Sequence, residues 1–208
     1  MSETIREIKV RETRYDDGRI KSREFYYVDG DGNDVLHGKR TYWDKNGQRS
    51  DEGEFVDGKP CGIFREWHDN GQLQTEETYE GGELSGLSCE WDENGTLIRR
   101  AEYHAGRLQG LVREYGPEGN ILVEEHYKDD ERDGKSLRYY DEGGLFIEME
   151  YTNDRLHGLS RMYASDGSEI TRTTYEHGEI VSRHIDERFA RILEKMSSAR
   201  RPKRNFQT

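Results

Sequence analysis

The stretch Cys61–Ser85, CGIFREWHDNGQLQTEETYEGGELS, is one copy of a unit that recurs along the chain. Two columns of glycine and two columns of aromatic residues repeat with a step of 24 residues. The glycine columns are Gly38, Gly62, Gly86, Gly110, Gly134, Gly158 and Gly47, Gly71, Gly95, Gly119, Gly143, Gly167. The aromatic columns are Trp43, Trp67, Trp91, Tyr115, Tyr139, Tyr163 and Phe55, Tyr79, Tyr103, Tyr127, Tyr151, Tyr175. A fixed period of this length indicates a repeat protein in which each unit is one supersecondary element.

Within the unit, the sequence predicts one strand over residues 62–68 and a second over residues 72–80. Asp69-Asn70-Gly71 between them has the composition of a tight turn, because Asp favours the start of a type I turn and Gly accepts the positive φ that follows. A three-residue loop that ends in Gly suits a type I turn with a G1 bulge. Each unit is therefore predicted to be a β-hairpin.

This loop length predicts a register with Trp67 opposite Leu73 and Arg65 opposite Thr75. Alternate residues of a strand share a face, so we expect Trp67, Leu73 and Tyr79 to lie on one face. Stacking of successive units would then join both aromatic columns into one apolar stripe, which we expect to form the core, while the opposite face stays polar.

The segment Glu80-Gly81-Gly82-Glu83 is a second turn, which leads into the next unit. The predicted fold is therefore all-β: a repeat meander of 24-residue β-hairpins that form one long antiparallel sheet of about fourteen strands. A sheet of that size twists, so we expect a curved ribbon.

Departures from the period divide the chain. Residues 1–36 form a divergent N-terminal capping repeat, because Gly18 precedes Gly47 by 29 residues. Residues 37–183 hold six regular repeats. A period of three to four residues then predicts a short C-terminal amphipathic helix over residues 184–198, and residues 199–208 are expected to be a basic disordered tail.

Composition limits the partners. The chain carries a net charge of −12 and 37% charged residues. An acidic body repels nucleic acid and anionic membranes and attracts a basic protein; alternatively, the charge only keeps an exposed sheet soluble. Cys61 and Cys89 indicate no disulfide framework. The N-terminus has no signal-peptide pattern and no segment is long and apolar enough to span a membrane, so we expect a cytoplasmic protein.

No cofactor or metal site is expected from the sequence. Asp29, Asp31 and Asn33 alternate as calcium ligands do, but the glycine and glutamate of an EF-hand loop are missing from the required positions. The histidines form no closely spaced ligand pair. Adjacent carboxylates such as Glu76-Glu77 point to opposite faces of a strand and cannot act together on one substrate. We expect a non-catalytic protein.

The unit resembles the MORN repeat, and most closely the shorter variant found in bacterial proteins. The matching segments are Tyr79-Glu80-Gly81-Gly82-Glu83-Leu84-Ser85-Gly86, Trp67 with Asn70-Gly71-Gln72-Leu73, and the pairs His37-Gly38 and His157-Gly158. Bacterial proteins built almost wholly of this variant are often labelled antitoxins of the YwqK type. The resemblance implies a cytoplasmic protein that neutralises a partner toxin by binding it.

We therefore interpret the chain as a protein-binding repeat scaffold of the antitoxin or immunity type. A single-layer sheet cannot bury large rings completely, so part of the first aromatic column should line an open trough with an acidic rim. The alternative is that twist closes the trough and the rings are ordinary core. The predicted binding residues are Trp43, Trp67, Trp91, Tyr115, Tyr139, Tyr163, Glu77 and Glu125. The alternatives are a groove enzyme that uses Glu76, Glu124 or Glu148, and weak membrane attachment through the C-terminal helix and basic tail.

Overall fold

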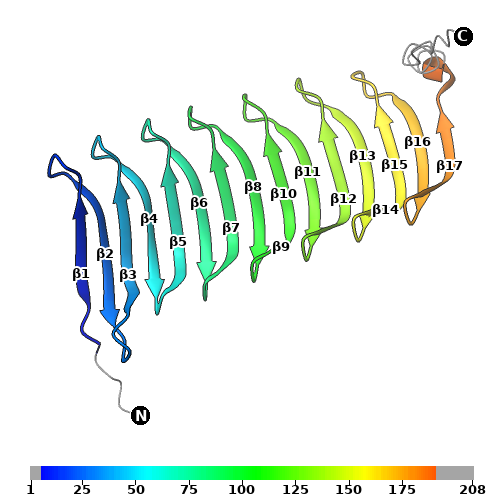
Figure 1. Ribbon diagram of the computed structural model, residues 1–208. Helices are drawn as coiled ribbons and strands as arrows, with labels where there is room; N and C mark the ends of the chain where they lie inside the picture. Colours follow the sequence, from blue (N-terminus) through cyan, green and yellow to red (C-terminus); the bar gives the residue numbers. More distant parts are fainter. Residues whose placement is uncertain (1–5, 191–208) are drawn as a thin grey trace, which may run out of the picture.

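A computed structural model describes residues 6–190, whose strands form a single sheet (Figure 1). The strands are β1 (Lys9–Arg14), β2 (Ile20–Val28), β3 (Asp34–Trp43), β4 (Arg49–Val56), β5 (Lys59–Trp67), β6 (Leu73–Glu80), β7 (Glu83–Trp91), β8 (Leu97–His104), β9 (Arg107–Leu108), β10 (Gly110–Tyr115), β11 (Ile121–Lys128), β12 (Glu131–Tyr139), β13 (Leu145–Thr152), β14 (Arg155–Leu156), β15 (Gly158–Tyr163), β16 (Glu169–Glu176) and β17 (Glu179–Ile185). The two-residue strands β9 and β14 directly precede β10 and β15.

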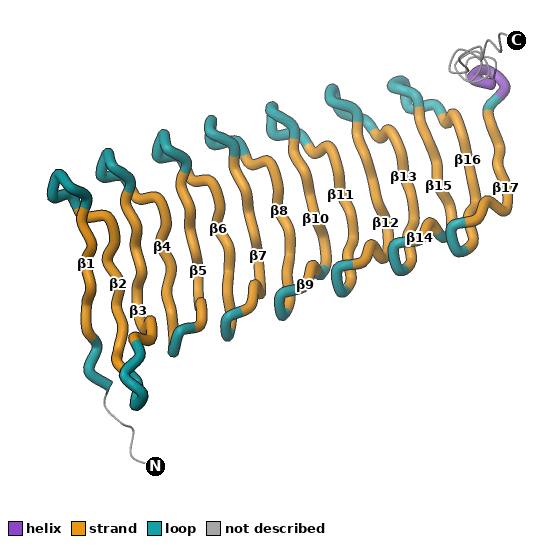
Figure 2. Tube along the Cα trace, in the orientation of Figure 1, coloured by secondary structure: helices purple, strands orange, loops and turns teal. Residues whose placement is uncertain are grey.

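Apart from β10 and β15, each strand pairs antiparallel with the one before it in the chain, so the sheet is a meander. The short strands β9 and β14 pair with β8 and β13, which also pair with β10 and β15. The hairpins stand side by side as one layer (Figure 2). The prediction of an all-β hairpin meander in one long antiparallel sheet is confirmed.

The turn within each hairpin forms as predicted. In the hairpin of β5 and β6, the N–H of Gly71 donates to the carbonyl of His68, and the N–H of His68 donates to the carbonyl of Gln72. Gly71 has a φ of 85°, the left-handed conformation for which the sequence provides glycine. Trp67 lies opposite Leu73, which confirms that part of the predicted register.

One extra residue on the second strand of every hairpin shifts the register beyond the turn. In β6 this residue is Gln74, so Glu66 lies opposite Thr75 and Arg65 lies opposite Glu76. The predicted pairing of Arg65 with Thr75 is therefore wrong. The equivalent bulged residues in the other hairpins are Lys21, Ser50, Ile98, Leu122, Phe146 and Ile170.

The bulge separates the two aromatic columns, because a shift of one residue moves all following side chains to the other face. Trp67 and Leu73 share one face, while Tyr79 shares the other with Phe64, whose ring centroid is 4.9 Å away. The prediction of one apolar stripe is wrong. We call the two surfaces the Trp face, which carries the Trp43–Tyr163 column, and the Tyr face, which carries the Phe55–Tyr175 column.

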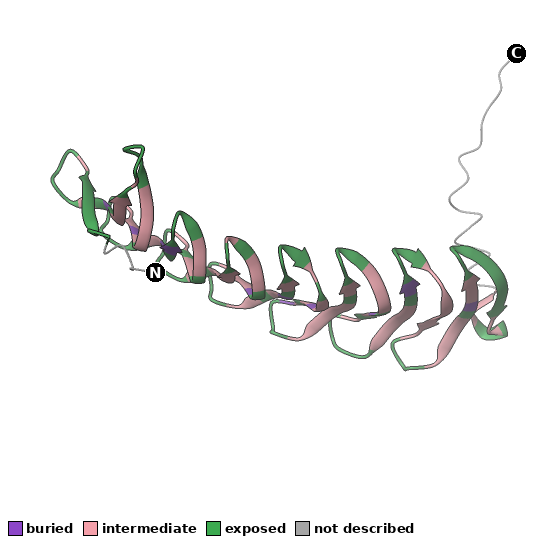
Figure 3. Cartoon of the chain, turned by 90° about the horizontal axis from the view of Figure 1, so that it is seen from below, coloured by how far each residue is buried: buried purple, intermediate pink, exposed green. Residues whose placement is uncertain are grey.

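The core lies on the Tyr face. The buried apolar side chains in residues 6–190 all belong to it: Phe55, Ala101, Val112 and Tyr151. Small polar residues fill the same face between the rings, among them Ser88 and Ser136. Buried segments recur from hairpin to hairpin along the ribbon, with exposed segments on either side (Figure 3). A one-layer sheet thus has a narrow core, which explains the low hydrophobic content of 31%.

The first glycine column marks a second irregularity, where consecutive hairpins meet. Between β6 and β7, Glu77 lies opposite Ser88 and Tyr79 lies opposite Leu84, so two additional residues are accommodated around Gly86. Gly86 has a φ of 122°, and a Cβ built there would meet the Thr78 side chain at 3.0 Å. Two added residues leave the alternation of faces unchanged, so this irregularity does not move Tyr79.

From β4 onward, the turns between hairpins have positive φ at both central residues, as type I′ turns require. Gly81 and Gly82 occupy these positions after β6, and Asp129 and Asp130 occupy them after β11 with φ of 51° and 72°. The Asp130 carboxylate accepts a hydrogen bond of 2.7 Å from the N–H of Leu108, one repeat earlier. This bond offsets the strain of a non-glycine residue at positive φ.

The ends of the sheet differ in part from the prediction. β17 continues to Ile185, and the helix begins only at Glu187, so residues 184 and 185 are not helical. Asp186 caps the helix by accepting from the N–H of Arg188 at 2.9 Å. The rest of the predicted helix and the basic tail lie outside the described residues.

At the N-terminal end of the sheet, the loop that follows β2 contains Asp29, whose carboxylate accepts hydrogen bonds from the backbone of the same loop. Asp29 Oδ1 accepts from the N–H groups of Asp31 and Asn33 at 2.9 Å each. This is a closed polar hairpin loop, and it contains the residues that make the first repeat longer than the others.

We expect Phe55→Ala to lower the free energy of unfolding by about 3–5 kcal/mol, because its buried ring packs on Phe64 with centroids 5.3 Å apart. Val56, the next residue of β4, is 47% exposed, and Val56→Ala should cost less than about 0.5 kcal/mol. Urea titration of both variants tests this assignment of faces. Equal losses would contradict it.

We expect Asp130→Ala to lower the free energy of unfolding by about 1–2 kcal/mol. Alanine is also strained at positive φ, and it cannot accept the hydrogen bond from the Leu108 N–H. Asp130→Gly loses the same hydrogen bond but adopts positive φ without strain. In chemical denaturation, Asp130→Gly should therefore lower the free energy of unfolding by less than Asp130→Ala does. If Asp130→Gly is the less stable variant, the account of this turn is wrong.

Candidate functional site

The first aromatic column forms a row along one edge of the Trp face. Each ring belongs to the last residue of the first strand of its hairpin, immediately before the turn. All six side chains are half-buried: Trp43, Trp67, Trp91, Tyr115, Tyr139 and Tyr163. This exposure follows from the single layer, since no second sheet covers the rings in residues 6–190. We call these six residues the aromatic row.

Side chains at the start of the turns tie the backbone of the row from repeat to repeat. His68 Nε2 is 2.8 Å from the carbonyl oxygen of Trp91, and the Tyr140 hydroxyl donates to the carbonyl of Tyr163 at 2.7 Å. The Tyr15 hydroxyl donates to the carbonyl of Trp43 at 2.8 Å. These contacts link the start of one turn to the backbone of the next hairpin beside the row.

Polar groups line the rings of the row. The Arg49 guanidinium lies 6.0 Å from the Trp67 ring centroid, and both residues line a cavity of about 290 Å³ between two turns. The Tyr139 hydroxyl donates to Glu124 at 2.9 Å. The row is thus amphipathic, which is typical of surfaces that bind other proteins.

Glu77 and Glu125, which the sequence placed beside the row, lie on the Tyr face. Glu77 is opposite Phe64 and accepts a hydrogen bond of 2.8 Å from the Tyr79 hydroxyl; Glu125 accepts one of the same length from Tyr127. Burial, and then these carboxylates, raise the pKa of both tyrosines to about 12. The bulge is the physical reason for this correction, because it reverses the face of every residue between it and the next hairpin.

The acidic rim of the aromatic row comes instead from the turns, which sequence reasoning missed. Exposed carboxylates recur in the turns next to the rings, and we call them the acidic turn edge: Asp69, Glu93, Glu118, Asp141, Glu142 and Asp166. The signal was available in the turn motif itself, which contains an Asp or Glu within the three residues before its glycine in each hairpin.

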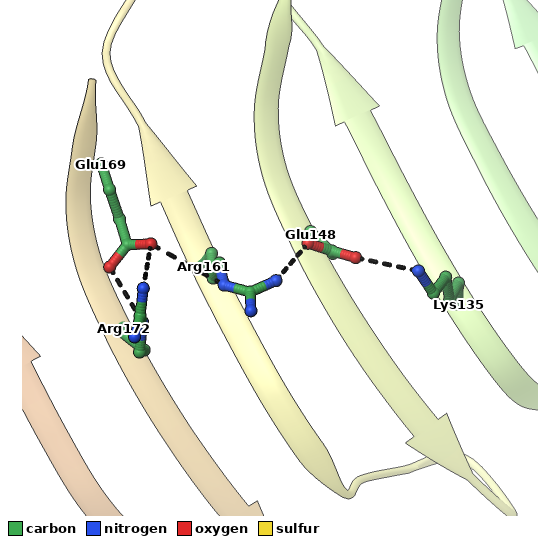
Figure 4. Close-up of polar contacts among 5 residues, drawn as sticks. All are labelled: Lys135, Glu148, Arg161, Glu169 and Arg172. Carbon is green, nitrogen blue, oxygen red and sulfur yellow. Dashed lines mark hydrogen bonds and ion pairs between the residues drawn. The ribbon is translucent and has the colours of Figure 1, made fainter. Parts of the chain in front are cut away.

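The middle of the Trp face carries cross-strand ion pairs (Figure 4). Glu148 on β13 contacts Lys135 of β12 at 3.2 Å and Arg161 of β15 at 3.0 Å. Arg161 also approaches Glu169 at 3.7 Å, and Glu169 contacts Arg172 at 3.0 Å. Four strands are therefore linked by alternating charges.

These pairs set the protonation of the strand carboxylates. Burial alone would raise the pKa of Glu148, but hydrogen bonds from Lys135 and Arg161 outweigh it and lower the pKa. Glu124 has the same balance, with burial opposed by hydrogen bonds from Arg113 and Tyr139, and its pKa is also lowered. Both groups are held as carboxylates at neutral pH.

Residues 6–190 hold no group of three or more His, Cys, Asp or Glu arranged to bind a metal ion. Within the same residues, no helix has both the length and the apolar character needed to cross a membrane.

We expect Glu148→Gln to destabilise the protein by about 1 kcal/mol at pH 7, the upper range for partly exposed ion pairs. Because the pKa of Glu148 is lower in the folded state, its stabilisation is present above the unfolded pKa and is lost as pH falls through the folded pKa. The difference in Tm between wild type and variant should therefore shrink from pH 7 to pH 3. Glu150→Gln, at an exposed position on the same strand, is the control. A difference that persists at pH 3 would contradict the prediction.

One comparison with known proteins, the scan against family models, agrees with the repeat. A family model described as "MORN repeat variant" matches residues 60–80, 108–129 and 132–153, which fall on the hairpins β5–β6, β9–β11 and β12–β13. No curated protein matches the chain. A solved structure of a protein of unknown function from Bacteroides fragilis NCTC 9343 matches with 8% identity and a TM-score of 0.17, over 88% of this chain and 95% of that one. The three matches identify units of the MORN repeat variant within residues 60–153 of this chain.

Proposed function

We propose that this protein is a non-catalytic scaffold that binds a basic protein partner through the aromatic row and the acidic turn edge. In this proposal, binding neutralises the partner, as an antitoxin or immunity protein does, and takes place in the cytoplasm. MORN repeats support the coarser part, a repeat scaffold that binds partners.

The observation that carries the proposal is the row itself: six half-buried aromatic residues at equivalent positions on one face of a single-layer sheet. Large aromatic side chains with a polar neighbour are enriched among the residues that contribute most to protein–protein affinity. Their regular spacing offers several equivalent contacts to one extended partner surface.

Charge supports the choice of a basic partner. The chain has a net charge of −12, and the acidic turn edge places exposed carboxylates directly beside the row. Such an arrangement accelerates association with a positive surface and discriminates against acidic partners.

The enzyme alternative is less well supported at Glu124 and Glu148. A general acid at neutral pH needs a raised pKa, whereas the ion pairs and hydrogen bonds of these two groups lower theirs. Glu76, the third candidate, pairs with Arg65 at 2.8 Å. These carboxylates are occupied in linking strands, which is a structural role.

The partner is tested by affinity capture with the tagged full-length protein from its source cell, with attention to the product of the adjacent gene. Recovery of a basic protein that binds the purified chain directly, and whose activity the chain inhibits, is the expected result. Failure to recover any protein at micromolar bait would count against the proposal.

We expect Tyr115→Ala to weaken this complex about 10- to 100-fold, as loss of an aromatic hot spot does. Tyr103→Ala removes the same side chain from the Tyr face of the neighbouring hairpin and should change affinity less than about 3-fold. Isothermal titration calorimetry measures both, after circular dichroism has shown that each variant is folded. Equal affinities for the two variants would place the interface elsewhere.

The acidic turn edge is tested separately through kinetics. Glu93→Lys together with Glu118→Lys should slow association by about 10-fold at low salt and have a smaller effect at 0.5 M salt, because screening removes steering. Stopped-flow mixing provides the rates. An association rate that is independent of both salt and these substitutions would contradict the role of the edge.

A further inference from the structure

A cavity of about 280 Å³ lies on the Tyr face, between the hairpins β3–β4 and β5–β6. It is on the opposite side of the sheet from the aromatic row, and nothing in the proposed function uses it. Its lining combines aromatic rings with carboxylates: Arg40, Asp51, Phe55, Pro60, Phe64, Glu66, Thr75, Glu77 and Tyr79.

The carboxylates of this cavity include two like charges that face each other. Asp51 on β4 lies directly opposite Glu66 on β5. Carboxylates at directly opposed positions of neighbouring strands destabilise a sheet. The same row of the sheet avoids this arrangement further along, where Arg99 stands opposite both Glu90 and Glu114 and contacts Glu90 at 3.1 Å.

The cavity has more negative than positive charge. Arg40 is the cation among its lining residues, and it pairs with Asp51 at 3.0 Å. The Tyr79 hydroxyl donates to Glu77, whereas Glu66 has no ion pair or side-chain hydrogen bond to any residue of 6–190. Burial, followed by the charges of Asp51 and Glu77, raises the pKa of Glu66, and Arg40 opposes this rise.

The aromatic wall is held rigidly in place. The Phe64 ring packs between Phe55 and Tyr79, with centroid separations of 5.3 and 4.9 Å. The same ring lies over Gly53, where any added Cβ would collide with it. A planar group that enters the cavity therefore meets a fixed ring surface beside a carboxylate.

Two arginines of this chain already pack on aromatic rings of the Tyr face. The Arg11 guanidinium lies 5.2 Å from the Tyr26 ring centroid and that of Arg40 lies 4.8 Å from Phe55. Both arginines also pair with a carboxylate on the neighbouring strand, Arg11 with Glu24 at 2.6 Å. A ring of this column with an adjacent carboxylate thus binds a guanidinium at two places in the same sheet.

We propose that the cavity between β3–β4 and β5–β6 binds an arginine side chain of a basic polypeptide, with its guanidinium against Glu66 and Glu77 and its plane on the Phe64–Tyr79 wall. Arginine suits the site better than lysine, because a planar guanidinium stacks on rings and bonds carboxylates in two directions at once. The excess of carboxylates over cations in the lining supplies the charge complementarity.

The probe is the peptide acetyl-Gly-Arg-Gly-amide, titrated into the ¹⁵N-labelled full-length protein at low salt and followed by two-dimensional NMR. We expect saturable shifts at the amides of Phe64, Glu66 and Tyr79. The same peptide with citrulline in place of arginine keeps the shape without the charge and should bind at least about 10-fold more weakly. The lysine peptide should fall between them.

Two variants localise the binding. Glu66→Gln removes one carboxylate without changing shape and should weaken the arginine peptide about 5- to 10-fold. Phe64→Ser removes the ring of the wall and should weaken binding of the arginine peptide; circular dichroism must show that this variant is folded, because the change also removes the packing of Phe64 on Phe55 and Tyr79. Glu114→Gln is the matched control, because Glu114 has the register position of Glu66 but faces Arg99; it should change affinity less than about 2-fold.

The proposal is overturned by any of three results: no shifts with the arginine peptide, equal binding of the citrulline peptide, or equal affinities of Glu66→Gln and Glu114→Gln. Shifts confined to the acidic turn edge would also overturn it. They would leave the proposed function standing, because that function depends on the other face and is tested with a different ligand.

Discussion

The structure depends on one constraint: a single extra residue on the second strand of each hairpin, just beyond its turn. This bulge occurs in all the hairpins from β1–β2 to β15–β16, at positions such as Gln74 and Phe146. Because it reverses the alternation of faces, it sends the two aromatic columns to opposite sides of the sheet. One column then contributes the buried rings of Phe55 and Tyr151 to the core of the Tyr face, whereas all six rings of the other column remain half-buried on the Trp face. The location of every candidate site follows from this separation.

Much of the fold could be predicted from the period alone. The spacing of the glycine columns, the Asp-Asn-Gly turns and the pairing of Trp67 with Leu73 follow from local rules of turn chemistry, and the structure has them all. The bulge at Gln74 was not predicted, because the side chains were expected to alternate between the two faces without interruption after the turn. A signal was present: Ile121-Leu122-Val123 and Leu145-Phe146-Ile147 are runs of consecutive apolar residues, which an uninterrupted half-buried strand does not contain. Three such residues in succession indicate that one of them is inserted.

The candidate site was predictable in its aromatic part and not in its charged part. The aromatic row needs only the period, since each ring precedes a turn. The partners of a charged residue depend on register between strands, and one shifted residue exchanges Thr75 for Glu76 opposite Arg65. For the same reason Glu77 and Glu125 were placed beside the wrong column, and the carboxylates of the turns, whose location does not depend on register, were overlooked although they were the safer inference.

Specific recognition in a repeat protein has to arise from departures from the repeat. All hairpins share one backbone geometry, so residues at equivalent positions differ only in chemistry. The position that Phe64 occupies holds Arg11 and Arg40 in the two preceding hairpins and Ser88 and Val112 in the two that follow. Where it is arginine, a cation of the chain itself covers the ring of the Tyr face; where it is small, the site closes as packed core, with Ser88 and Val112 buried. Phe64 is neither an arginine nor a small residue. Its ring forms the wall of a cavity whose lining has more carboxylates than cations. The repeat builds the sheet, and the exceptions to it determine where the sheet has a cavity with charge to neutralise.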